Sequence, residues 1–149
     1  MKYNLFIILI AITCNSLAQK GVPYLVNFEP DEHLKSDVIA VSQDSRGVML
    51  FTTKKGIVTF DGFQWSLFKT KKPPVAIEYH QQSKTNFILF KNSLESLNIN
   101  EYGNYYLDSL FTNPDSLHNF EYLTITDEQF FISTESQIFV LDSEYKQIG

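Results

Sequence analysis

Short apolar segments separated by polar turn residues run along most of this chain. The clearest stretch holds four such segments, at positions 38–41, 49–53, 57–60 and 63–68. Glycines stand in the turns between them, where a residue with positive φ can close a hairpin. The pattern predicts four antiparallel strands joined by hairpins, which together make one blade of a β-propeller.

The same pattern recurs twice in weaker form. With the first unit it gives repeats at about 38–68, 75–110 and 121–148. Phe51, Leu89 and Phe131 take comparable places in the second strand of each unit, 38 and 42 positions apart. A period of about 40 with four short strands per unit is typical of propeller repeats. We therefore predict an all-β fold, a partial β-propeller of about three four-stranded antiparallel blades over 35–149. A sandwich and an ordinary meander are the alternatives.

The N-terminus has the features of a secretory signal. A positive Lys2 precedes an apolar run over 5–13, and Ser16 and Ala18 supply the small residues that a signal peptidase reads. We predict a signal peptide over 1–18, with an uncleaved signal anchor as the alternative. The protein is then periplasmic or secreted, and it is membrane-anchored where it forms part of a full-length receptor.

The segment that follows the signal, 19–34, is predicted to be an extended lead-in, because Pro23 and Pro30 break any helix. The single cysteine, Cys14, lies within the predicted signal. After cleavage the exported chain forms no disulfide, so its stability depends on packing and strand pairing.

The composition excludes some classes of function but does not specify one. The chain is 44% hydrophobic and 15% aromatic, which suits a packed sheet protein, and its formal net charge is −5. An acidic chain has no electrostatic reason to bind nucleic acid. The one basic cluster, Lys69, Lys71 and Lys72, is interpreted as a solvated loop between strands.

The first unit carries a specific motif. It reads Gln43-Asp44-Ser45-Arg46-Gly47 after the first strand, Gly56 after the second, and Asp61-Gly62-Phe63-Gln64-Trp65 after the third. Over some thirty residues it resembles the two-component regulator propeller repeat of large bacterial sensors. The glycines would permit turns, the aspartates would bond backbone N–H groups, and the tryptophan would pack between neighbouring blades. These structural repeat residues are Asp44, Gly47, Gly56, Asp61, Gly62 and Trp65.

The resemblance also implies partners. In sensors of this family an exported propeller is followed by a triple-tyrosine sandwich domain, a membrane helix and a cytoplasmic output domain. It implies a non-catalytic extracytoplasmic sensor that binds an extracellular ligand, for example a glycan. Its other partners would be the rest of a propeller and a membrane-anchored output domain, with a homodimer left open and no nucleic acid. The alternative is a free secreted propeller that binds glycans or proteins.

Candidate chemistry is sparse. The three histidines, scattered without metal-ligand spacing, are His33, His80 and His118. The sequence contains no nucleophile elbow and no phosphate-binding glycine loop. Asp108, Asp115 and Asp142 are considered for calcium, but no loop has the ligand spacing. We expect no enzyme activity, no cofactor and no metal.

A last expectation concerns the open ends of an incomplete ring. A three-unit array buries only the faces between neighbours. We expect Phe130, Ile132, Phe139 and Leu141 to form an exposed apolar surface on the third unit, where a following blade would cover them. The isolated chain would then be marginally stable or prone to aggregate.

Overall fold

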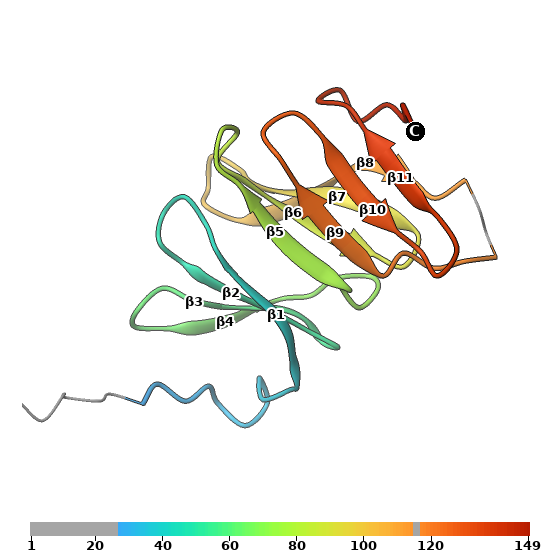
Figure 1. Ribbon diagram of the computed structural model, residues 1–149. Helices are drawn as coiled ribbons and strands as arrows, with labels where there is room; N and C mark the ends of the chain where they lie inside the picture. Colours follow the sequence, from blue (N-terminus) through green and yellow to red (C-terminus); the bar gives the residue numbers. More distant parts are fainter. Residues whose placement is uncertain (1–26, 115–116) are drawn as a thin grey trace, which may run out of the picture.

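Strands and turns make up the described part of the chain. The computed structural model describes residues 27–114 and 117–149, and within them it contains eleven strands and no helix (Figure 1). In chain order these are β1 (Val38–Gln43), β2 (Met49–Thr53), β3 (Gly56–Phe60), β4 (Trp65–Phe68), β5 (Ala76–His80), β6 (Thr85–Phe90), β7 (Ser93–Ile99), β8 (Tyr105–Thr112), β9 (Tyr122–Ile125), β10 (Phe130–Ser133) and β11 (Ile138–Leu141). The predicted all-β fold is confirmed.

The strands form three antiparallel sheets in which chain neighbours pair. The first sheet has the order β1-β2-β3-β4, the second β5-β6-β7-β8 and the third β11-β10-β9. In Figure 1 the sheets follow one another, and β5 lies beside β1 on one side and beside β9 on the other. The first strands of successive sheets are thus neighbours, as they are around the axis of a propeller. The arrangement is that of part of a propeller.

Two apolar cores hold the sheets together. Between the first and second sheets, the fully buried side chains of Leu50 and Ile57 meet those of Ile77 and Ile88. The larger core joins the second sheet to the third, and its buried members are Phe87, Leu89, Leu94, Phe120, Leu123, Phe130, Ile132, Phe139 and Leu141. The second sheet is therefore packed on both faces, since successive residues of a strand point to opposite sides.

The expectation of an exposed apolar surface formed by these four residues of the third sheet is wrong. Phe130, Ile132, Phe139 and Leu141 are all buried, and they pack against the second sheet. The other face of the third sheet instead presents Tyr122 and Ile138, which are exposed, together with smaller or half-buried side chains. The reason is the register. Because β10 and β11 are apolar at nearly every position, their sequence does not indicate which alternate set meets the neighbouring sheet.

The third sheet also has three strands rather than the predicted four. After β11 the chain turns at 142–146, and Gln147 then forms an isolated antiparallel bridge with Leu141. Two backbone bonds join Val140 to Ile148 and Gly149. Residues 147–149 therefore lie beside β11, where the first two sheets have their fourth strand, without forming a strand of their own.

The signal-peptide prediction for 1–18 and the first part of the lead-in, 19–26, concern residues outside the described ones, and so does Asp115. From residue 27 to β1 the lead-in is irregular, with one turn at 32–34. Since the described residues form no helix, they include none that could cross a membrane.

Candidate functional site

The first motif turn is built around the carboxylate of Asp44. Its Oδ1 accepts hydrogen bonds from the backbone N–H groups of Arg46 and Val48, at 2.8 and 2.9 Å. The N–H of Gly47 donates to the Asp44 carbonyl at 3.0 Å, and Gly47 has φ +86°, which suits glycine. The turn from β1 to β2 is thus built on the Asp44 carboxylate and Gly47, and the Gln43 side-chain amide adds a bond to the Gly47 carbonyl at 2.9 Å.

Two further turns repeat this geometry without repeating the motif. Asn100 Oδ1 accepts from the N–H groups of residues 102 and 104, and Asp142 Oδ1 from those of residues 144 and 146. Gly103 and Tyr145 hold the positive φ, at +81° and +61°. The sequence indicates a turn at 101–104, but the motif pairs Asp with Gly, so it does not mark Asn100 or Asp142 as capping residues. A pattern of Asn or Asp with Gly three positions later would have identified Asn100 as a capping residue.

The second motif turn joins β3 to β4. Asp61 Oδ1 accepts from the N–H groups of Phe63 and Gln64, both at 2.8 Å, and these bonds lower the pKa of the exposed carboxyl. Gly62 has φ +99°, and a Cβ placed there would meet nothing within 4 Å. Backbone conformation alone therefore requires glycine at this position.

Gly56 serves a different purpose, which is a close approach between chain segments. It has φ +129°, and a Cβ at this position would lie 2.4 Å from the Phe68 carbonyl oxygen and 3.2 Å from the Cα of Lys69. The end of β4 and the loop after it can pass this near to β3 only because residue 56 has no side chain. Gly56 thereby sets where the lysine-bearing loop lies.

Trp65 lies on the face of the first sheet that points away from the second sheet, called here the open face. It stacks on Phe60 with ring centroids 4.5 Å apart, and its ring lies 5.5 Å from that of Phe51. Strand register places Phe51, Val58, Phe60 and Trp65 together on this face. The second sheet packs on the opposite face, and outside the first sheet the described residues that border Trp65 are those of the lead-in. That Trp65 packs between neighbouring blades stays a prediction for this open face.

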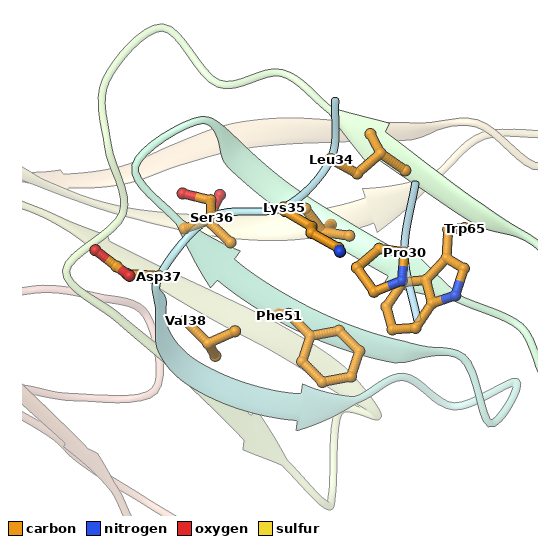
Figure 2. Close-up of a pocket in the computed structure, with 10 residues that line it drawn as sticks. Pro30, Leu34, Lys35, Ser36, Asp37, Val38, Phe51 and Trp65 are labelled. Carbon is orange, nitrogen blue, oxygen red and sulfur yellow. The ribbon is translucent and has the colours of Figure 1, made fainter. Parts of the chain in front are cut away.

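The lead-in crosses the open face, and the two line an open pocket of about 630 Å³ (Figure 2). Pro30 and Leu34 line it from the lead-in, and Phe51, Val58 and Trp65 line it from the sheet. Leu34 is only 4% exposed. The Lys55 ammonium holds the lead-in by donating to the carbonyl oxygens of residues 33 and 35, at 2.9 and 2.8 Å. An apolar side chain or ligand is what this lining suits.

A polar contact joins the first two sheets. The Tyr105 hydroxyl of β8 donates to Asp44 Oδ2 at 2.7 Å, and the Arg46 guanidinium bonds the same oxygen at 3.0 Å while lying 5.0 Å from the Tyr105 ring centroid. Burial and the neighbouring carboxylate raise the pKa of Tyr105 to about 12. Burial opposes ionisation of Asp44, but the bonds from Tyr105, Val48 and Arg46 outweigh it and lower the pKa of this carboxyl. The contact is therefore an ion pair with a neutral tyrosine donor.

Tyr105 also borders a groove between the two sheets. Lys69, Lys71 and Lys72, from the loop between β4 and β5, line one side of it. The loop is exposed, as interpreted from the sequence, but its lysines share this hollow with residues of the second sheet. Sequence reasoning missed the groove because its two walls come from different sheets and lie well apart in the chain.

No metal site is evident in the part of the chain that the structure describes, since no three His, Cys, Asp or Glu side chains lie close enough to hold an ion. Asp142 caps its turn, and Asp108 accepts a hydrogen bond from Asn98. His33, His80 and His118 come from different parts of the fold.

Comparison with protein-family models gives no match, and no curated protein matches the chain either.

Proposed function

We propose that this chain is a non-catalytic, extracytoplasmic ligand-binding module, the N-terminal propeller part of a bacterial signal-transduction receptor. The observation that carries the proposal is the first sheet. Its open face presents Phe51, Phe60 and Trp65 to an irregular lead-in over a large apolar pocket. An aromatic face of this kind is what a blade offers to the next blade of a ring. Three sheets are fewer than the four to eight that closed propellers hold.

The resemblance of the first unit to the two-component regulator propeller repeat supports the same proposal. Asp44 and Asp61 act as turn caps, Gly47, Gly56 and Gly62 take positive φ, and each has a structural part in the fold. Motif residues used in this way are scaffold residues, which leaves ligand recognition to surfaces between the sheets. The alternative is a free secreted propeller that binds glycans or proteins, and both proposals require export.

Export and receptor membership are tested separately. Residues 1–40 fused to alkaline phosphatase, an enzyme active only after export, should give activity in a Gram-negative host, and a Lys2→Glu, Ile8→Arg variant of the fusion should not. The exported chain should begin at Gln19. A fusion without activity would contradict an extracytoplasmic role.

Receptor membership is tested by the coding sequence that follows codon 149. A reading frame that continues into further repeats, a membrane helix and an output domain is the expected result. A stop codon followed by an unrelated gene would contradict the receptor proposal and favour the free secreted propeller.

A further inference from the structure

The groove between the first and second sheets has the size and lining of a small-molecule site. Its volume is about 530 Å³, within the range of about 300–1,000 Å³ usual for ligand pockets. Its walls come from two separate sheets, with Phe68 at the end of β4 on one side and Phe90, Tyr105 and Leu107 on the other. A pocket formed between packed elements is a common place for a ligand to bind.

Positive charge lines one side of the groove. Lys69, Lys71 and Lys72 all border it, and Glu95 is the one acidic residue in its lining. Glu95 Oε1 already accepts a hydrogen bond from the Ser93 hydroxyl at 2.9 Å. Among the described residues, none of the three lysines forms a salt bridge. In a chain of net charge −5, three uncompensated ammonium groups at one hollow create a local positive potential.

The lysine loop is held in place rather than free. Gly56 allows its start to pass against β3, as described above. Inside the loop the Thr70 hydroxyl donates to the Lys72 carbonyl at 2.6 Å, and the Lys72 ammonium donates to Asn92 Oδ1 at 2.7 Å. The fully buried Pro74 then leads into the second sheet. Because the loop backbone is held at both ends and the Lys72 ammonium is held by Asn92, less backbone entropy is lost when the loop binds an anion.

The remaining lining is mostly apolar and aromatic. The rings of Phe68 and Tyr105 lie 6.1 Å apart across the two sheets, and Leu107 lies further along β8. Tyr106, 42% exposed, stands at the groove as well. Such a surface binds the flat or aliphatic body of a ligand, while the lysines bind its charged group.

We propose that this groove binds a small amphipathic organic anion, with a carboxylate, sulfate or phosphate group on an apolar body. The lysine ammoniums pair with the anionic group, and the body lies against Phe68, Tyr105 and Leu107. This inference specifies a ligand class for the binding module proposed above, and it therefore rests on that proposed function. Binding is measured on purified protein and export is measured in cells, so either can fail alone.

The test uses 2-naphthalenesulfonate as the probe and neutral 2-naphthol as its matched comparison. Each is titrated into the purified chain by calorimetry and by amide chemical-shift mapping. The variant Lys69→Gln/Lys71→Gln removes two charges at the groove. Lys84→Gln/Lys146→Gln is its control, since it removes two charges from exposed turns elsewhere.

We expect the sulfonate to bind at least fivefold more tightly than the naphthol, with shift changes at the β4–β5 loop and along β8. The groove variant should lose about tenfold in affinity for the sulfonate, an effect typical of losing charged contacts, and the control variant should bind like the parent. Raising the salt concentration should weaken binding to the parent more than to the groove variant. Equal binding of sulfonate and naphthol, an unchanged affinity of the groove variant, or shift changes centred on Trp65 would each overturn the proposal.

Discussion

The two faces of the first sheet differ in what covers them. On the face toward the second sheet, Leu50 and Ile57 are completely buried in a core shared with another sheet. On the open face, Phe51 and Trp65 remain half-buried beneath an irregular segment with a large pocket between. Both faces come from the same strands, alternate residue by residue, and both are apolar. The first sheet is therefore suited to packing on both of its faces, like a blade within a ring.

The closed face should contribute more to stability than the open face. Leu50→Ala removes a side chain of 0% exposure and leaves a cavity in the core between the sheets, so it should lower the free energy of unfolding by about 2–5 kcal/mol. Phe51→Ala removes a larger side chain from the open face but should lower it by less, because that side chain borders a hollow. Urea unfolding of both variants measures the difference. A larger loss for Phe51→Ala would contradict the unequal roles of the faces.

Substitutions at Gly56 and Gly62 separate two reasons for glycine, a steric clash of an added Cβ and the positive φ of the backbone. Both have positive φ, so each change to alanine should lower the free energy of unfolding by about 1–3 kcal/mol. Gly56→Ala should lower it by about a further 1–3 kcal/mol, since its Cβ would overlap the Phe68 carbonyl, whereas Gly62→Ala meets no atom. Thermal or urea unfolding measures both variants. Equal losses would show that the β4 end can move away from β3 at no energetic expense.

The stability contributed by the contact between Tyr105 and Asp44 should depend on pH. Tyr105→Phe removes the donor to Asp44 and should lower the free energy of unfolding by about 1–2 kcal/mol at neutral pH, as for a hydrogen bond to a charged acceptor. The folded pKa of Asp44 lies below its ordinary value of 3.8. Its stabilising effect is therefore fully present above that value and is lost as the pH falls through the lower, folded pKa.

Urea unfolding of the parent and of Tyr105→Phe, at about pH 6 and again at about pH 2.5, measures this dependence. The difference between the two proteins should be larger at the higher pH and smaller at the lower one. A difference that stays constant with pH would indicate that the hydroxyl stabilises the fold by packing rather than by its bond to the ionised carboxylate.

The smallest effect is expected where the lead-in is held to the open face. Lys55→Gln removes the ammonium that bonds two lead-in carbonyls, and because this side chain is exposed, stability should change by less than about 1 kcal/mol. Trp65, the single tryptophan, reports the open face directly. Acrylamide should quench its fluorescence more strongly in the variant than in the parent, while Lys84→Gln should leave quenching unchanged. Unaltered quenching in Lys55→Gln would mean that other contacts hold the lead-in.

The strands, the hairpins and the three-unit repeat could all be predicted from the sequence. These depend on local chemistry, since apolar segments of strand length and turn residues such as Asp44, Gly47 and Gly62 act within a few positions of themselves. The Asn100 cap also has a local signal, an Asx residue with glycine three positions later. The repeat follows because each unit has the same local pattern.

The tertiary structure alone decided which face of each sheet meets a neighbour. Strand alternation defines two faces but does not say what covers either one, so the burial of Phe130 and Leu141 came out opposite to expectation. The groove is of the same kind, because it joins Lys69 and Lys71 to Tyr105 of another sheet. Contacts between residues so far apart in the chain arise when sheets pack, and local sequence patterns do not encode them.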